Sequence, residues 1–164
     1  MLSFPTQTVS AGAVQVNGTL DPDDKVWLEG DDRPTGAGIR VTGRLAVAGP
    51  GRYYFSGALT GAVTQECRRC LGEVATPVVA EARVLFADSS HTDDDDPDVF
   101  PLATGKRGGE VDLRPAVRQE WLLQVPPFAE CRPDCRGLCP TCCANLNQGA
   151  CTCARTPESA SGSA

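Results

Sequence analysis

The sequence predicts a small antiparallel, β-rich α+β domain with one main helix and a cysteine-rich C-terminal tail. Three observations support this fold class. Apolar and polar residues alternate along three stretches between residues 39 and 86, as they do in half-buried strands. Between residues 113 and 125 the apolar residues recur at four-residue steps, which is the spacing along one face of a helix. Seven of the nine cysteines lie between residues 131 and 153.

The composition limits both the size of the core and the compartment. Of the 164 residues 41% are apolar and only 5% aromatic, so we expect one modest core built from Val, Leu and Ala. Residues 1–10 lack the basic start and apolar run of a signal peptide, and no apolar run approaches the ~20 residues that cross a membrane. We therefore expect a cytoplasmic protein. In that reducing compartment, clustered cysteines are more often metal ligands than disulfides.

The patterns divide the chain into four consecutive parts. These are an irregular segment at residues 1–37, a β-rich core at residues 38–127, a cysteine-rich tail at residues 128–154 and a flexible end at residues 155–164. Within the irregular segment, only residues 8–16 have the composition of a strand.

The core is expected to contain an antiparallel meander of three strands. Residues 67–72 fall at one of its turns, and Gly57 and Gly61 interrupt the apolar stripe, which predicts bulges or close backbone contacts there. The side chains that share the buried parity are Ile39, Val41, Leu45, Val47, Tyr53, Phe55, Leu59, Val63, Val74, Thr76, Val78, Ala80, Ala82, Val84 and Phe86.

A loop and a helix follow the meander. Residues 88–112 contain eight acidic and two basic residues, so residues 88–109 are expected to form a solvated loop in which His91 is an exposed bystander. The helix is predicted at residues 113–125, with Asp112 as its N-cap. This helix is expected to pack on the sheet.

The cysteines fall into four closely spaced pairs. A structural zinc ion takes four ligands in a tetrahedron and is commonly held by two such pairs, because a short gap lets both thiolates reach one ion. Four pairs therefore predict two zinc sites, and at least one. The last two pairs are separated by a short loop, so they are expected to close on each other and leave the first two pairs to combine. Site 1 then consists of Cys67, Cys70, Cys131 and Cys135, and site 2 of Cys139, Cys142, Cys151 and Cys153.

The spacing leaves alternatives open. One zinc site could be drawn from the six tail ligands with Cys67 and Cys70 free, or these two thiols could form a reversible disulfide in redox chemistry. Cys143 is the thiol left over, at a position where such turns usually carry glycine, and it could exchange with Cys142 as a ligand. Catalytic zinc usually needs His and an open position, and no nucleophile–base set stands out, so no enzymatic activity is expected.

Four arginines lie inside or beside the first two cysteine pairs. A zinc ion bound by four thiolates has a net negative charge, which neighbouring guanidinium groups can neutralise. The same groups could instead contact the phosphates of RNA. The sequence does not decide between these two roles for Arg68, Arg69, Arg132 and Arg136.

Three blocks of the sequence, in the right order, resemble one known family. ECRRCL at residues 66–71 is similar to its C-x-R-C-L strand turn, and EVDL followed by EWLLQVP at residues 110–126 is similar to its helix block. CRGLCPTCCANLNQGACTC at residues 135–153 resembles its C-terminal tail. The family is the bacterial YceD family, the large ribosomal RNA subunit accumulation proteins. The chain departs from its pattern at Cys143, where the family has Gly, and at Arg136, where it has Lys.

The resemblance implies a non-enzymatic protein of the bacterial cytoplasm that supports accumulation of large-subunit ribosomal RNA. Its partner would be either precursor ribosomal RNA or a large-subunit ribosomal protein, with no membrane and no small-molecule substrate. A zinc-braced protein-interaction module without RNA contact is the second hypothesis, and a thiol redox switch is the third.

Overall fold

The computed structural model describes residues 1–88, 98–105 and 108–155. Two sequence predictions, the solvated acidic run with His91 and all but the first residue of the flexible end at residues 155–164, lie outside these residues. In the described part of the chain, no helix is both long and apolar enough to cross a membrane.

The chain forms two compact units. The first comprises Met1–Val63 and Thr76–Val125, and the second comprises Thr64–Ala75 and Pro126–Ala164. The turn that the sequence places between two core strands therefore belongs to the same unit as the cysteine-rich tail.

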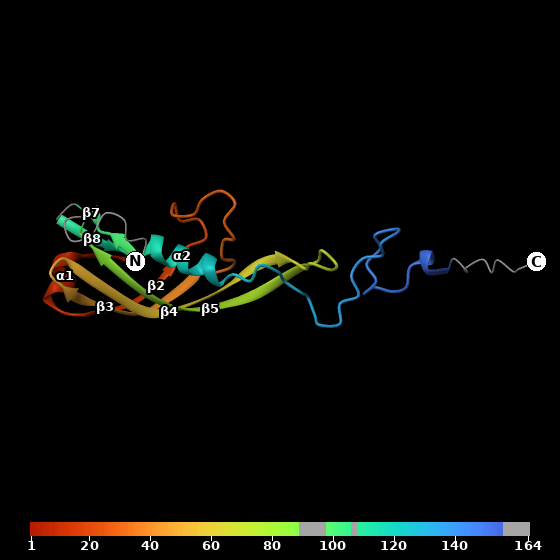
Figure 1. Cartoon of the computed structure of the whole chain (residues 1–164), viewed down its shortest axis with the longest axis horizontal. Coiled ribbons are helices and arrows are strands. Elements are labelled where there is room, and N and C mark those ends of the chain that lie inside the picture. The colour runs from red at the N-terminus through yellow and green to blue at the C-terminus, as the bar shows by residue number, and fades with distance from the viewer. Residues whose placement is uncertain (89–97, 106–107, 156–164) are drawn as a thin grey trace, which may run out of the picture. The chain divides into compact units, whose positions relative to one another are not determined.

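The first unit contains most of a five-stranded sheet of order β2-β3-β4-β5-β6 (Figure 1). Its strands are β2 (Val14–Leu20), β3 (Ile39–Gly49), β4 (Arg52–Glu66), β5 (Glu73–Ala87) and β6 (Val99–Pro101). β3 pairs antiparallel with both β2 and β4, whereas β6 pairs parallel with the end of β5. The three strands predicted from alternation are thus confirmed as β3, β4 and β5.

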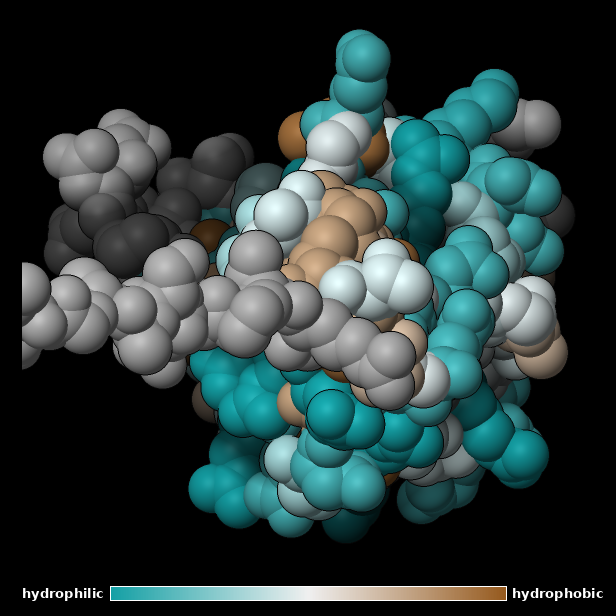
Figure 2. Space-filling view, turned by 90° about the vertical axis from the view of Figure 1, so that its right-hand side faces the viewer, coloured by the Kyte–Doolittle hydropathy of each residue, from teal (hydrophilic) through white to brown (hydrophobic). Residues whose placement is uncertain are grey.

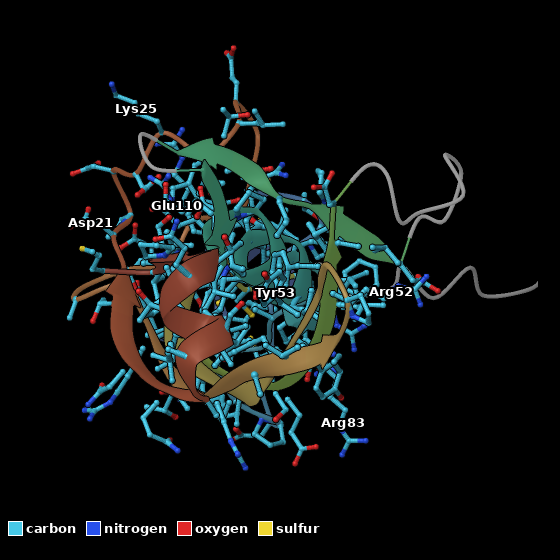
Figure 3. All side chains as sticks on the ribbon, turned by 90° about the vertical axis from the view of Figure 1, so that its left-hand side faces the viewer. Asp21, Lys25, Arg52, Tyr53, Arg83 and Glu110 are labelled. Atoms are coloured by element: carbon cyan, nitrogen blue, oxygen red, sulfur yellow. The ribbon has the colours of Figure 1, made fainter. Side chains whose placement is uncertain are left out.

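The buried face of these strands carries the residues whose alternation predicted it. Ile39 and Leu59 are fully buried in the core. Val47 has the same parity but is exposed, and it lies near the end of β3, where the register with β4 shifts. Figure 3 shows the strands curving around an interior that is filled with side chains, with Tyr53 inside and Arg83 at the periphery.

The N-terminal segment differs from the irregular structure that the sequence predicts. It contains β1 (Ser3–Pro5), α1 (Thr6–Ala11) and β2, so helix replaces the first part of the strand expected at residues 8–16. α1 buries a single side chain, Val9, which gives no repeat from which a helix could be recognised. Such a short helix is stable only through its tertiary contacts.

A second sheet, of order β1-β8-β7, corrects the prediction of a loop at residues 88–109. β7 (Ala103–Gly105) and β8 (Gly108–Asp112) lie wholly or partly in that range, as β6 does. β8 pairs antiparallel with β1, with Val111 opposite Phe4. β8 also pairs antiparallel with its sequence neighbour β7. The strands are short, and residues 103–112 have no apolar–polar alternation that would reveal them.

α2 (Arg114–Gln124) is the helix predicted at residues 113–125. It packs on the core of the first unit through Ala116, Val117 and Trp121. The N-cap position is occupied by Leu113 and not by the predicted Asp112. The Asp112 carboxylate nevertheless accepts a hydrogen bond of 3.0 Å from the backbone N–H of Arg114, so it still serves the start of the helix.

α2 lies close to the backbone of β4 at Gly61, where the sequence predicts a bulge or a close backbone contact. A Cβ atom added to Gly61 would lie 2.9 Å from the ring of Trp121. The indole Nε1 of Trp121 donates a hydrogen bond of 2.8 Å to the carbonyl of Asp32. Glycine on β4 therefore makes the space for the largest fully buried side chain of the unit.

Candidate metal centres

The second unit begins with a tight turn between β4 and β5 that carries the first cysteine pair. The N–H of Cys67 donates to the carbonyl of Gly72 at 2.8 Å, and the N–H of Leu71 donates to the carbonyl of Cys67 at 2.9 Å. Leu71 has a left-handed backbone with φ of 57°. Backbone N–H groups of Cys131 and of the turn itself point at the Cys67 sulfur and lower the pKa of this thiol to about 6.

Cys131 and Cys135 join this pair in a group of four sulfurs. All four Sγ atoms lie within 4.8 Å of one another, with 3.9 Å between Cys67 and Cys135 and 3.7 Å between Cys70 and Cys131. A disulfide needs roughly 2 Å, whereas a tetrahedron with Zn–S bonds of ~2.3 Å has edges of roughly 3.8 Å. The sulfurs predicted as site 1 thus have the separation of a tetrahedral thiolate site.

The sulfurs of site 1 differ in how readily they ionise. The side chain of Asn147 donates a hydrogen bond to the Cys135 sulfur and lowers the pKa of that thiol. The thiol of Cys131 instead hydrogen-bonds to Cys135, and this contact raises the pKa of Cys131 to about 12. Ionising all four thiols therefore requires a positive charge at their centre, which a divalent metal ion supplies.

The tail repeats the same turn around the third cysteine pair. The N–H of Cys139 donates to the carbonyl of Ala144 at 2.8 Å, and the N–H of Cys143 donates to the carbonyl of Cys139 at 2.9 Å. Cys143 has a left-handed backbone with φ of 58°. The backbone N–H groups of Cys142 and Thr141 point at the Cys139 sulfur and lower the pKa of its thiol to about 6.

The second group of four sulfurs is the set predicted as site 2. Its Sγ atoms also lie within 4.8 Å of one another. Hydrogen bonding to the Cys142 sulfur raises the pKa of Cys153 to about 12, so this group too needs a cation before every thiol can ionise. A pocket of about 310 Å³ opens beside the site and is lined partly by Leu146 and Arg136. Cys143, predicted as the leftover thiol, is exposed and belongs to neither group.

Three of the four arginines considered for RNA contact have carboxylate partners inside this unit. Arg68 donates from Nε to Glu130 at 2.7 Å, and Arg69 lies 3.6 Å from the same carboxylate. Arg132 lies 3.4 Å from the carboxylate of Asp134. The three arginine side chains are still 51%, 42% and 48% exposed, respectively, so part of each guanidinium group faces solvent.

Three residues of this unit were not singled out by the sequence. Glu130 holds two arginines together, and Asn147 contacts a sulfur of site 1. Phe128 is 68% exposed, and the guanidinium carbon of Arg68 lies 6.0 Å from the centre of its ring. Only Asn147 has a signal in the sequence, because it lies at the Leu–Asn end of the tail segment that resembles the family. Figure 2 shows a face of the molecule on which a few hydrophobic residues are surrounded by hydrophilic ones.

A family model and one named relative identify the same family. The family model described as large ribosomal RNA subunit accumulation protein YceD matches residues 55–161. The chain is 27% identical over 130 residues to the maize (Zea mays) large ribosomal RNA subunit accumulation protein YCED homolog 1, chloroplastic, a match that covers 63% of this chain and 44% of that protein. It is 32% identical over 89 residues to uncharacterized proteins of Mycobacterium tuberculosis and Mycobacterium bovis, covering 53% of this chain and 42% of theirs. The chain thus spans less than half the length of these relatives, and no solved structure matches it significantly.

Proposed function

The chain belongs to the YceD family, and we therefore propose that it supports accumulation of large-subunit ribosomal RNA in the bacterial cytoplasm. We assign it no catalysed reaction. The observation that carries the proposal is that both four-cysteine groups lie within the region that matches the family model. The functional part of the chain is then the second unit, whose turn and tail present a fixed surface to a partner.

Zinc is the metal that fits both groups. Four thiolate sulfurs in a tetrahedral arrangement are a set of ligands typical of structural zinc. When bound, the ions would supply the positive charge and the metal–sulfur bonds that lock the turn and the tail together. Each group offers four protein sulfurs and no open position for a substrate, which supports a structural role over a catalytic one.

The direct test of the function is the ratio of large- to small-subunit ribosomal RNA in cells that lack the protein. We expect this ratio to fall and to recover when the wild-type chain is supplied. A chain with Cys67→Ser and Cys153→Ser, one change in each cysteine group, should not restore it. An unchanged ratio in the deletion strain would refute the proposal.

Direct contact with precursor RNA is the first form of the proposal. The guanidinium groups of Arg68, Arg69 and Arg132 are positioned by carboxylates of the same unit, and they retain exposed surface. Arg136 is exposed and lines the pocket beside site 2. Fixed cations of this kind can bind phosphates, and the affinity then depends steeply on salt.

Binding of the full chain to a large-subunit ribosomal RNA transcript, measured over a range of salt, tests this form. Each phosphate contact contributes roughly 0.7–0.9 to the slope of log K against log salt. Replacing the four arginines of the second unit by Ala should flatten the slope by roughly 3. The matched control replaces four exposed arginines of the first unit by Ala and should leave the slope unchanged. The control positions are Arg33, Arg40, Arg44 and Arg83.

Binding of a large-subunit protein without RNA contact is the second form. It is favoured by one observation: Glu130 already engages Arg68 and Arg69, while Leu71 and Phe128 expose 58% and 68% of their surface in the same unit. This form predicts that large-subunit proteins stay bound after RNase treatment. Leu71→Ser with Phe128→Ser should abolish that binding, whereas Val79→Ser, a change at a 70% exposed position of the first unit, should not.

A further inference from the structure

The loop that connects the ligands of site 2 also reaches site 1. It comprises the eight residues between Cys142 and Cys151, both of which belong to site 2. Asn147, near the middle of this loop, donates a hydrogen bond from Nδ2 to the sulfur of Cys135 at 3.3 Å. One loop thus has its two ends at one cysteine group and its central side chain at the other.

The amide of Asn147 is held in a single orientation by its other contacts. Its Oδ1 accepts a hydrogen bond of 2.8 Å from the backbone N–H of Arg136 and one of 2.9 Å from the guanidinium group of Arg132. Its Nδ2 also donates to Oδ1 of Asn145 at 2.9 Å. The two donors to Oδ1 flank Cys135 in sequence, so the Asn147 nitrogen is the atom that faces the sulfur.

Backbone hydrogen bonds fix the same loop to the first cysteine turn. The N–H of Leu146 donates to the carbonyl of Gly137 at 2.9 Å, and the N–H of Leu138 donates to the carbonyl of Arg69 at 3.1 Å. Gly137 has φ of 73°, and a Cβ added there would lie 3.0 Å from the Arg69 carbonyl oxygen. A continuous path of hydrogen bonds therefore runs from the first turn to the loop of site 2.

We propose that Asn147 couples the two metal centres, so that filling site 2 strengthens metal binding at site 1 and filling site 1 strengthens binding at site 2. This inference rests on the metal sites of the proposed function. A hydrogen-bond donor to a metal-bound sulfur stabilises its negative charge, and loss of such outer contacts typically weakens metal affinity ~10–100-fold. Asn147 can make this contact only while its loop is closed, and the ligands at the two ends of the loop close it. Coupling of two sites is reciprocal by thermodynamic necessity.

Competition titrations of the reduced, metal-free full chain with Co²⁺ and then Zn²⁺ test the coupling. Single-site variants give the intrinsic constants: Cys151→Ser with Cys153→Ser leaves site 1, and Cys67→Ser with Cys70→Ser leaves site 2. The product of the two stepwise association constants of the full chain should exceed the product of the intrinsic constants by about 5- to 150-fold. Asn147→Ala should remove this excess.

Two further variants separate the contact with sulfur from the rest of the loop. Gln148→Ala, at an exposed neighbouring position of the same loop, should keep the full excess. Asn147→Asp keeps an oxygen toward Arg136 and Arg132 but replaces the donor to Cys135 with a negative charge. It should lose the excess and shift the sulfur-to-cobalt charge-transfer band of site 1, which a merely structural role of Asn147 would not produce.

The outcomes are distinguishable. Two bound ions with independent constants, or an excess that survives both Asn147→Ala and Asn147→Asp, would overturn the coupling and leave the metal sites standing. A full chain that shows no cobalt–thiolate absorption would overturn the metal sites, and the coupling with them. Neither result depends on the ribosomal RNA ratio, so the proposed cellular function is judged separately.

Discussion

Leu71 and Cys143 occupy equivalent positions in two copies of one turn. Each follows the second cysteine of a pair, has a left-handed backbone with φ of 57° or 58°, and donates its N–H to the carbonyl of the first cysteine at 2.9 Å. This equivalence explains why Cys143 is the one cysteine of the tail that belongs to neither four-cysteine group. Cys143 stands where the turn needs a left-handed residue, and a leucine fills the same position in the other turn, so the position does not require a ligand.

Cys143→Gly should therefore stabilise the second unit without changing its metal content. Left-handed backbone costs a residue with a side chain roughly 1 kcal/mol, and glycine avoids most of this cost. We expect a rise of up to about 1 kcal/mol in the free energy of unfolding of the zinc-loaded chain, measured by urea denaturation, with two zinc ions still bound. Gly137→Ala, at a position with φ of 73°, should instead lower the free energy of unfolding. A fall to one zinc ion in Cys143→Gly would show that this thiol is a ligand.

Metal content and free thiols should distinguish two sites from one. With eight of nine cysteines as ligands, the wild-type chain should hold two zinc ions and react as if it had about one free thiol. Cys67→Ser and Cys153→Ser should each lower the zinc content by about one ion per chain, determined by elemental analysis. If site 1 does not exist and the tail alone binds zinc, Cys67→Ser will leave the zinc content unchanged. A reversible disulfide with little metal in the purified protein would instead favour a redox switch.

Chelation of the metal should loosen the second unit and spare the first. Cys70 and Cys131 are 61 positions apart, and a cross-link over a loop of that length restricts the unfolded chain by roughly 4 kcal/mol in the chain-entropy model. The large core cluster that contains Ile39 and Trp121 lies wholly in the first unit. Hydrogen exchange should therefore speed up in residues 64–75 and 126–155 and stay slow in β3. Equal acceleration in both units would show that the first unit also depends on the metal.

The sequence predicted those parts of the structure that carry a local repeat. The alternation around Val41 and Leu59 identified β3 and β4, and the four-residue stripe through Val117 and Trp121 identified α2. The cysteine spacing also predicted which sulfurs come together, because the short loop between Cys142 and Cys151 pairs the last four ligands and leaves the first two pairs to combine. The strands, the helix and site 2 are each visible within a window of the length of one element or loop, whereas site 1 followed by elimination from the four cysteine pairs.

The features that the sequence did not reveal depend on residues far apart in the chain. One of the two partners of β8 is β1, near the start of the chain, and α1 buries Val9 in the core of the first unit. The contact of Asn147 with Cys135 joins a side chain to a sulfur twelve positions away, and the Glu130 pair with Arg68 spans 62 positions. Polar contacts of this kind have no periodicity, so only the folded chain shows them.

An ion pair between Asp31 and Arg118 should make the stability of the first unit depend on pH. Nε and one terminal nitrogen of Arg118 donate to the two carboxylate oxygens at 2.6 Å and 2.8 Å, and the side chains are 10% and 23% exposed. The hydrogen bonds from Arg118 hold the pKa of Asp31 below its usual range. The pKa is thus lower in the folded chain than in the unfolded chain. The stabilisation is therefore complete above the unfolded pKa of ~3.9 and is lost as the pH falls through the folded pKa.

Asp31→Asn should accordingly lower the free energy of unfolding by about 1–2 kcal/mol at pH 7, because it leaves a partly buried Arg118 without its charged partner. The difference from wild type should shrink below about pH 4 and vanish once Asp31 is protonated in both states. Urea denaturation at several pH values, followed by the fluorescence of the buried Trp121, measures both quantities. Glu81→Gln is the matched control, because its pair with Arg83 is 3.6 Å long with side chains 81% and 73% exposed, and a pair so exposed contributes little. A difference between Asp31→Asn and wild type that stays constant down to pH 2 would show that the substitution acts through lost packing and not through the charge of Asp31.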